Sequence, residues 1–303
     1  MTTAIAHPNI ALCKYWGKLD LERNLPATAS LSLTLAPFAT RTTVEWGAET
    51  DEAWLGGSRV DGTKVFRVLD RLVPGRAPAH VWSENNFPTS AGLASSASGF
   101  AALVMAAAPE RSLDELASFA RLGSGSATRS LHGGWVEWAQ AGERGVPVAP
   151  AEHWDVRMVV AVLASGPKAT PSTEGMLHTA ATSPYYPAWV EHAQDDVEEA
   201  RAAVLSRELE RLGRVMERSS MRMHASMLAA DPPLCYWRPG SIDAMDVVRG
   251  LRAGGLSAWY TMDAGPNVKV LCAAADAETV AGALRQVCER VEVLHPGGSA
   301  RVV

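Results

Sequence analysis

The stretch NNFPTSAGLASSASG, residues 85–99, is the most informative segment of this 303-residue sequence. A turn containing Pro88 and Gly92 leads into small residues and then into an apolar run, 97–108, which predicts a buried helix. A helix N-terminus presents unpaired N–H groups and partial positive charge, so it attracts phosphate. A tightly packed helix start without a ligand is the alternative. Because small residues dominate 92–98, we favour a phosphate-binding loop, although no Walker A Gly-Lys-Ser/Thr follows.

A second loop of small residues, GSGSATR at 123–129, ends in an arginine. Its glycines permit positive φ, and its serines offer hydrogen-bond donors. The guanidinium of Arg129 suits a carboxylate or a phosphate, because it donates two parallel hydrogen bonds. A mobile loop with a solvated arginine explains the same pattern, and the residues alone do not separate the two interpretations.

Lysines bracket two aromatic residues in HPNIALCKYWGKLD, residues 7–20. Lys14 and Lys18, four apart, are compatible with a solvated helix face. Gly17 interrupts a helix, however, and the apolar run 10–13 leads directly into the lysines. We therefore expect them at the end of a strand, a placement that suits anion binding.

Asp263 lies in YTMDAGPN, residues 260–267, between two predicted strands. An aspartate that starts a tight hairpin through an Asx-turn accounts for this position without any catalysis. A catalytic role requires that the loop of Asp263 face the segments that contain Lys14 and Ser95.

The rest of the chain mixes strands and helices without a strict βαβ rhythm. Runs with period 2, or rich in aromatic and β-branched residues, predict strands at 40–46, 80–83, 134–139, 158–164, 257–262, 268–274 and 291–294. Helical spacing predicts helices over 97–108, 112–122, about 189–229, 241–252 and 276–290, with Ser112, Ser206 and Ser241 as caps. This mixture predicts an α+β fold with two domains, residues 1–170 and 171–303.

Composition excludes several classes of protein. With 28 Lys+Arg against 33 Asp+Glu, the formal charge of −5 excludes binding of nucleic acid through net charge. The longest apolar run, 100–108, is far shorter than the ~20 residues that span a bilayer. Neither the eight histidines nor the four scattered cysteines have the spacing of a metal site or a disulfide framework. We expect a cytoplasmic protein, with no nucleic-acid or membrane partner.

Taken in order, these motifs resemble the mevalonate diphosphate decarboxylases, a branch of the GHMP kinase superfamily. The resemblance covers nearly the whole chain, through AHPNIALCKYWGK (6–18), NNFPTSAGLASSASG (85–99), ARLGSGSATRSLHGGWVEW (120–138), PSTEGM (171–176), ATSP (181–184) and WYTMDAGPNVKVL (259–271). It implies an ATP-phosphate-binding domain like ribosomal protein S5 domain 2 (1–170), a ferredoxin-like α+β domain with the catalytic aspartate (171–303) and an active site between them. It also implies ATP with Mg²⁺, and a homodimer.

The implied reaction converts (R)-5-diphosphomevalonate and ATP into isopentenyl diphosphate, ADP, phosphate and CO₂. In this resemblance Asp263 takes the proton of the 3-hydroxyl, Lys14 offsets charge on the transferred phosphoryl group and Arg129 holds the substrate carboxylate. The other implied substrate positions are Asn9, Tyr15, Trp16, Lys18, Ser124, Gly125 and Ser126. The implied ATP positions are Asn85, Gly92, Leu93, Ala94, Ser95 and Ser96, with Ser96 also a contact of the γ-phosphate or Mg²⁺.

The sequence departs from the family pattern where the substrate phosphates bind. Leu19 follows KYWGK where many relatives carry arginine, and Ala27-Thr28-Ala29 replaces a commoner Asn-Ser-Ser. Lys64, with Arg67 as its rival, occupies the place of a phosphate-binding arginine, and a lysine lacks the bidentate fork. Mevalonate 5-phosphate therefore stays a possible substrate. Two further hypotheses are a mevalonate 3-kinase that does not decarboxylate its product and a non-catalytic ligand sensor.

Overall fold

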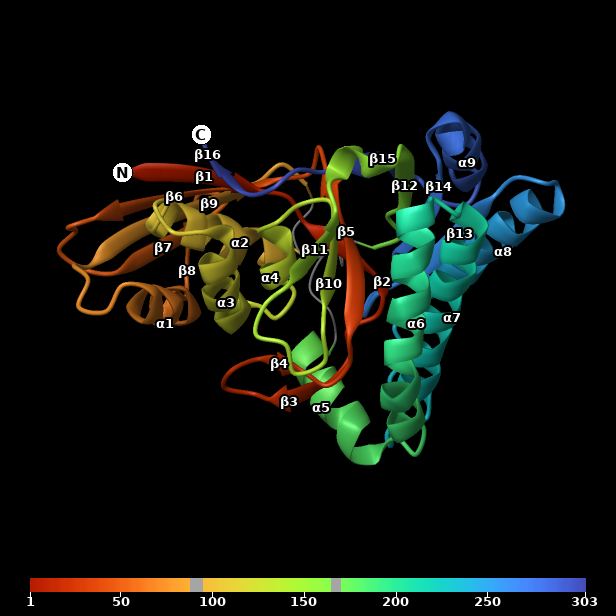
Figure 1. The fold of residues 1–303 in the computed structure, drawn as a ribbon, viewed down its shortest axis with the longest axis horizontal. Helices are drawn as coiled ribbons and strands as arrows, with labels where there is room; N and C mark the ends of the chain where they lie inside the picture. The colour runs from red at the N-terminus through yellow and green to blue at the C-terminus, as the bar shows by residue number, and fades with distance from the viewer. Residues whose placement is uncertain (88–94, 165–169) are drawn as a thin grey trace.

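The computed structural model describes residues 1–87, 95–164 and 170–303. Within these residues the strands form two large sheets, which lie in two lobes (Figure 1). The long strand β5 (Ser30–Ala36) lies near the junction of the lobes, and a small hairpin of β3 (Lys18–Asp20) and β4 (Leu25–Pro26) projects beside it. Both chain termini lie on the first lobe, where β16 pairs with β1.

The first sheet carries the helix that begins in the serine-rich segment. Its order in the described residues is β16-β1-β6-β9-β7-β8, antiparallel except for the parallel pair β7 and β9. In that order the strands span Arg301–Val302, Thr2–Ala6, Thr40–Trp46, Ala79–Asn85, Glu52–Leu55 and Ser58–Val60. Helix α2 (Ser95–Ala107) packs against β1 and β6, while α1 (Thr63–Leu72), α3 (Leu113–Gly123) and α4 (Ala127–Ser130) cover its other sides. From Ala101 to Ala107 every residue of α2 is buried, so this part of the helix is apolar all round.

The second sheet joins the two lobes. Its described order is β11-β10-β5-β15-β12-β14-β13, with β2 paired to β5. These strands span Val146–Ala149, Trp135–Trp138, Ser30–Ala36, Val291–Pro296, Val156–Ala161, Val268–Ala273 and Ala258–Met262, and β2 spans Asn9–Cys13. Strand β5 pairs with β10 and β2 from the first part of the chain and with β15 from its end, so its hydrogen bonds link the lobes.

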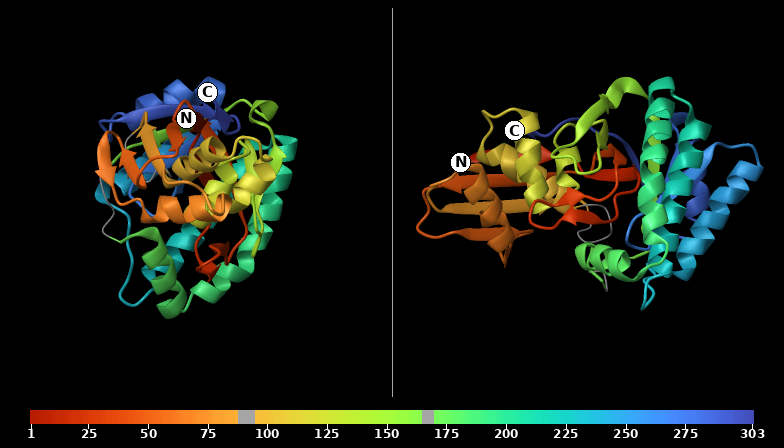
Figure 2. Two further views of the ribbon diagram at one scale, coloured as in Figure 1. Left: turned by 90° about the vertical axis from the view of Figure 1, so that its left-hand side faces the viewer. Right: turned by 60° about the horizontal axis from the view of Figure 1, so that its bottom comes forward.

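Helices cover both faces of this sheet (Figures 1 and 2). The long helices α6 (Tyr186–Ser206) and α7 (Leu209–Leu228) run side by side over one face, and α8 (Pro239–Ala253) and α9 (Ala277–Leu284) cover the other. Neighbouring residues of β12 show the alternation: Val160 packs with the α6 and α7 side, and Val159 packs with the α8 and α9 side. Helix α5 (Ser172–Thr182) lies near the β3–β4 hairpin, and its Met176 shares an apolar cluster with Trp189 of α6 and Met223 of α7.

Most of the expected elements are confirmed, including the helix at 97–108 and the capping box of Ser112 and Glu115. Three details are wrong. Ser206 is not a cap, because its hydroxyl donates to Ala202 O and the turn after α6 is made by Arg207 with φ 59°. Ser241 is not the N-cap of α8 but lies in its first turn, because Arg238 is the N-cap, and α9 is shorter than expected.

Helix α8 begins earlier because Pro239 is suited to a first turn, and Ser241 Oγ accepts a hydrogen bond from Arg238 N at 3.1 Å. Helix α9 ends at Leu284 rather than at 290, because the chain must turn there for β15 to pair with β12. The domain boundary predicted near residue 170 stays a prediction. Sheet pairing crosses that boundary in both directions, since β12 pairs with β14 and β16 pairs with β1.

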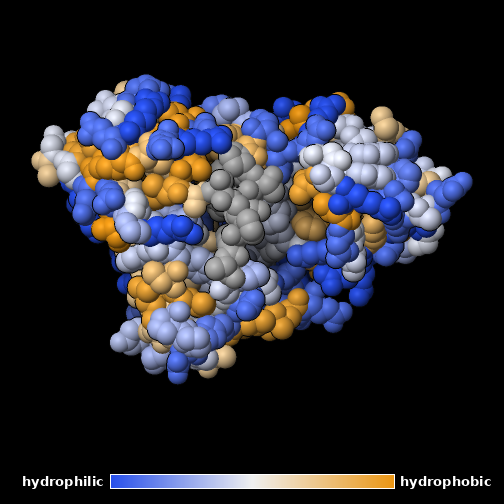
Figure 3. Space-filling view, turned by 180° about the vertical axis from the view of Figure 1, so that it is seen from behind, coloured by the Kyte–Doolittle hydropathy of each residue, from blue (hydrophilic) through white to orange (hydrophobic). Residues whose placement is uncertain are grey.

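In the described part of the chain, no helix combines the length and the apolar character that crossing a membrane requires. The face shown in Figure 3 is largely hydrophilic, with apolar residues gathered in several separate patches.

Candidate active site

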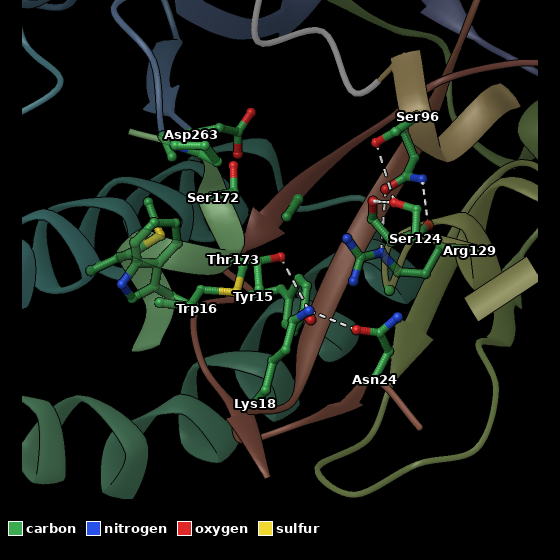
Figure 4. Close-up of a pocket in the computed structure, with 18 of the residues that line it drawn as sticks. Tyr15, Trp16, Lys18, Asn24, Ser96, Ser124, Arg129, Ser172, Thr173 and Asp263 are labelled. Atoms are coloured by element: carbon green, nitrogen blue, oxygen red, sulfur yellow. Dashed lines mark hydrogen bonds between the residues drawn. The ribbon is translucent and has the colours of Figure 1, made fainter. Parts of the chain in front are cut away.

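A cavity of about 340 Å³ brings together side chains from both ends of the chain (Figure 4). Segments in and after β2, in the first turn of α2, around α4, at the start of α5 and after β13 all contribute to its wall. The lining residues that the sequence predicted are Asn9, Tyr15, Trp16, Lys18, Lys64, Ser96, Ser124, Gly125, Ser126, Arg129 and Asp263. Asp263 and Ser96 thus line the same cavity, and Asp263 also contacts Lys14. A catalytic role of Asp263 required this arrangement, in which its loop faces the segments that contain Lys14 and Ser95.

Asp263 is held between two buried lysines at one end of this cavity. Lys14 Nζ lies 2.7 Å from Asp263 Oδ1, and Lys269 Nζ lies 3.0 Å from Asp263 Oδ2. Burial alone would raise the pKa of Asp263, but the two ammonium groups reverse this and hold its pKa well below the ordinary range. Burial lowers the pKa of Lys14 to about 8, against the opposite pull of Asp263. We call these three residues the Lys–Asp–Lys cluster.

Helix α7 fixes the backbone on both sides of this cluster. Ser219 Oγ accepts a hydrogen bond from Lys14 N at 3.0 Å. The next residue, Ser220, accepts from Met262 N at 3.0 Å and donates to Met262 O at 3.2 Å. His224, one turn further on, also hydrogen-bonds to the backbone at Met262, and burial lowers its pKa to about 3, so the ring is neutral. One rigid helix therefore positions the lysine after β2 and the aspartate after β13.

Arg129 lies in the wall of the cavity on the short helix α4 and is almost fully buried. Its Nη1 donates to Ser30 Oγ at 2.7 Å and its Nε donates to Asn9 Oδ1 at 3.3 Å. The ring of Tyr15 lies 6.0 Å from the guanidinium carbon. Burial lowers the pKa of Arg129 to about 10, which still leaves it charged at neutral pH. A buried, oriented guanidinium without a carboxylate partner in the described residues suits an anionic ligand.

Gly125 is required for the wall beside Arg129. A Cβ at this position would lie 2.7 Å from Tyr15 Oη and 3.1 Å from the Trp138 ring. Any larger residue would therefore displace the tyrosine from the cavity.

Lys18 and Lys64 lie at another part of the cavity wall. Lys18 Nζ donates to Asn24 Oδ1 at 2.6 Å and to Thr173 Oγ1 at 3.2 Å. Burial, and secondarily the charge of Lys64, lowers the pKa of Lys18 to about 8. Arg67, the rival of Lys64, is not among the lining residues in the described part of the chain. Figure 4 shows Asp263 and the Lys18–Asn24 pair far apart in the view, with Arg129 at the side between them.

A second, strongly apolar cavity of about 240 Å³ adjoins the first at the start of α2. Ser96 lines both cavities. Asn85 and Ser95, predicted to bind ATP, line the second cavity, together with apolar residues that include Trp54, Leu55, Val60, Val65 and Phe100. The predicted ATP residues Gly92, Leu93 and Ala94 lie outside the described residues.

Two groups of residues were not found from the sequence. Lys269 is fully buried in β14, and a lysine inside the apolar run VKVLCA was the signal that could have revealed it. Asn24, Ser172 and Thr173 also line the cavity. Lys14 was predicted as a site residue, but it reaches the site only through Asp263, because it does not line the cavity in the described residues.

No group of three or more His, Cys, Asp or Glu side chains suited to a metal ion occurs among the described residues. The donors available at the start of α2 are hydroxyls: Ser96 Oγ is exposed there and lies 3.3 Å from Ser124 Oγ. Oxygen donors of this kind fit Mg²⁺, which is commonly held by one or two protein oxygens together with substrate phosphates.

Known proteins match both halves of the chain. Residues 6–147 match the family described as diphosphomevalonate decarboxylase-like N-terminal domain, and residues 158–296 match the mevalonate 5-diphosphate decarboxylase C-terminal domain. The diphosphomevalonate decarboxylase of Candida albicans is 37% identical over 294 residues, which are 86% of this chain and 81% of that protein.

Solved structures agree along the whole chain. The mevalonate diphosphate decarboxylase of Staphylococcus aureus superposes with a TM-score of 0.93 at 36% identity, covering 100% of this chain and 97% of that one. A structure described as MDDEF in complex with MVAPP, AMPPCP and magnesium gives a TM-score of 0.92 at 37% identity, covering 100% and 98%.

The fold and the site define a two-domain α+β enzyme of the GHMP kinase fold, with a first domain like ribosomal protein S5 domain 2 and a ferredoxin-like second domain. Within that class, the chain belongs to the diphosphomevalonate decarboxylase family, and it is a decarboxylase of the mevalonate pathway.

Proposed function

We propose that this enzyme converts (R)-5-diphosphomevalonate and ATP into isopentenyl diphosphate, ADP, phosphate and CO₂, with Asp263 as the residue that receives the proton of the 3-hydroxyl. One observation carries the assignment of residues. The carboxylate of Asp263 lies in the wall of the same cavity as Ser96, Arg129 and Lys18. These side chains provide a proton acceptor, a nucleotide contact, a carboxylate ligand and a phosphate ligand.

The chemistry explains why these groups are needed together. A 3-hydroxy acid has no carbonyl that could receive the electrons of the breaking C–C bond. Transfer of the γ-phosphoryl group of ATP to the 3-oxygen releases ADP and turns that oxygen into a leaving group. The C3–O bond then breaks with its electron pair on phosphate, the C1–C2 electron pair forms the C2=C3 bond, and C1 departs as CO₂.

The Lys–Asp–Lys cluster determines when the proton moves. Two ammonium groups stabilise the Asp263 carboxylate, so it is a weak base towards an ordinary alcohol. The acidity of the 3-hydroxyl rises sharply once its oxygen bonds to phosphorus. We therefore place proton transfer late, with Asp263 first accepting a hydrogen bond from the hydroxyl and so aiming its oxygen. Lys14 supplies positive charge near the transferred phosphoryl group.

Arg129 is proposed to hold the substrate carboxylate through paired hydrogen bonds. Its own contacts with Ser30 and Asn9 orient the guanidinium before the substrate arrives. Tyr15, Trp16, Ser124, Gly125 and Ser126 form the wall around this end of the substrate. Lys18 and Lys64 are proposed to bind the 5-diphosphate.

ATP is proposed to bind across Ser96, with its phosphates towards Asp263 and its base in the apolar second cavity. The flat base suits a site lined by Trp54, Val65 and Phe100. A helix N-terminus attracts phosphates through its backbone N–H groups, and α2 begins beside this cavity at Ser95. Ser96 is the residue that would hold Mg²⁺, together with the phosphates. When bound, the ion would neutralise negative charge on the γ-phosphoryl group that is transferred.

A comparison of three substrates tests this function. With ATP and Mg²⁺ we expect CO₂ release from 5-diphosphomevalonate to exceed release from the 5-phosphate and, by a wider margin, from bare mevalonate. Lys18 and Lys64 contact only the phosphates in the proposed binding mode. The names of the relatives support the 5-diphosphate as substrate. Faster release from the 5-phosphate would establish that compound as the substrate instead, and a stable 3-phosphate without CO₂ would establish a 3-kinase.

We also propose that the enzyme works as a homodimer in the cytoplasm. The family resemblance supports the dimer, and four free thiols, one of them the exposed Cys235, suit a reducing compartment.

A further inference from the structure

The cavity differs in charge between its two ends. At one end, the single carboxylate of Asp263 neutralises one of its two lysines. At the other end, neither Lys18 nor Lys64 forms an ion pair with any acidic side chain of the described residues. Lys18 has neutral partners instead, Asn24 Oδ1 at 2.6 Å and Thr173 Oγ1 at 3.2 Å. No carboxylate of the described residues therefore offsets the positive charge at this end, which leaves it open to a phosphate.

Asn24 is anchored so that its oxygen must face Lys18. Its Nδ2 donates to Arg121 O and Leu122 O, both at 3.0 Å, in the last turn of α3. Carbonyl groups accept hydrogen bonds and do not donate them, so the nitrogen of the amide has to face the helix. The residue is buried and has φ 52°, a conformation that asparagine adopts more readily than most residues. Both its backbone and its side chain therefore fit this one orientation.

A neutral acceptor has a consequence that a carboxylate would not have. The Asn24 oxygen orients the ammonium of Lys18 and restricts the rotation of the long lysine side chain before the substrate binds, which reduces the entropy lost on binding. An aspartate at this position would also orient the ammonium, but it would cancel the positive charge, whereas the amide does not. The last-turn carbonyls to which Asn24 donates belong to a buried helix end, so the anchor is as rigid as α3 itself.

We propose that Asn24 is a positioning residue that sets the affinity of the enzyme for the terminal phosphate of its substrate, by holding the ammonium of Lys18 oriented at that end of the cavity without offsetting its charge. This inference rests on the proposed function for the identity of the substrate. It assigns no chemical step to Asn24, which acts through Lys18.

A double-mutant cycle tests the proposal. The variants are Asn24→Ala, Lys18→Met and both together, with KM for 5-diphosphomevalonate and kcat as readouts. Asn24→Ala is expected to raise KM about 10-fold, the scale of a hydrogen bond to a charged group, with kcat and the KM for ATP little changed. In the Lys18→Met background the same substitution is expected to change KM hardly at all. An equal rise in KM in both backgrounds would overturn the proposal.

A charged variant separates electrostatics from structure. Asn24→Asp adds a negative charge beside Lys18, so its KM is expected to exceed that of Asn24→Ala. A KM no higher than that of the alanine variant would contradict the mechanism. The matched control is Ser112→Ala, which removes the cap at the opposite end of α3 and does not touch the cavity. It is expected to lower the melting temperature and leave KM unchanged, and a rise in KM equal to that of Asn24→Ala would overturn the proposal.

Binding of inorganic diphosphate, measured by calorimetry without turnover, keeps this test independent of the reaction. Asn24→Ala is expected to raise the dissociation constant of diphosphate about 10-fold, by the same reasoning. If the wild-type enzyme releases no CO₂ but this shift is found, the proposed function fails and the role of Asn24 stands. Unchanged binding of diphosphate in the variant would refute the role of Asn24 itself.

Discussion

Replacing Asp263 by asparagine is expected to lower CO₂ release from 5-diphosphomevalonate by about 10²–10⁴-fold or more, the usual contribution of a positioned proton acceptor. Asparagine keeps the size of the side chain but accepts no proton. It also leaves the ammonium groups of Lys14 and Lys269, now 2.7 and 3.0 Å from a carboxylate oxygen, without a counter-charge. The rate is measured under saturating ATP and Mg²⁺, with ADP and CO₂ followed together.

The matched control for this variant is Asp196→Asn. Asp196 is also a buried carboxylate held by two cations, Arg218 and Arg222, but it lies between α6 and α7 outside the cavity. We expect it to lower the melting temperature while kcat/KM changes only a few-fold. Substantial CO₂ release by Asp263→Asn, or an equal loss in both variants, would refute the assignment of the proton acceptor.

Replacing Arg129 by glutamine is expected to lower kcat/KM for CO₂ release by about 10²–10³-fold, the scale of removing one partner of a desolvated charge pair. Glutamine can still contact Ser30 and Asn9, but it brings no charge to the substrate carboxylate. The substrate would then bind weakly and present its C1–C2 bond in a poor orientation. Steady-state kinetics over a wide range of substrate concentration separates the two effects.

Arg76→Gln is the corresponding control. The side chain of Arg76 is also buried and is paired with Asp51 and Asp70 on the first lobe, outside the cavity. We expect a loss of stability with almost unchanged kcat/KM. Retention of wild-type kcat/KM by Arg129→Gln would show that another group holds the carboxylate.

The sequence predicted best those features that depend on residues close together in the chain. The run 97–108 is apolar because most of α2 is buried between the sheet and the neighbouring helices, and the capping box of Ser112 depends only on residues three apart. The prediction that Lys14 follows a strand rested on Gly17 as a residue that interrupts a helix. In the structure Gly17 has φ +120°, and β2 ends at Cys13, immediately before Lys14. The contact of Lys14 with Asp263, by contrast, joins residues 249 apart and was predicted only through the family resemblance.

Other features depend on packing that no local pattern reveals. Asn24 lies in a polar hairpin, and its role arises only because the end of α3 lies against it. Ser219 and Ser220 accept hydrogen bonds from the backbone of Lys14 and Met262 because α7 crosses the ends of β2 and β13. Helix α9 ends early because pairing of β15 with β12 outweighs the helical propensity of the residues that follow Leu284.

The most direct measurement follows the 3-hydroxyl oxygen of the substrate. If that oxygen accepts the γ-phosphoryl group beside Asp263 and then leaves with it, 5-diphosphomevalonate labelled with ¹⁸O at the 3-hydroxyl must pass its label to the inorganic phosphate. We predict one labelled phosphate for each CO₂ and each ADP. Unlabelled phosphate, formed while CO₂ is still released, would contradict the account.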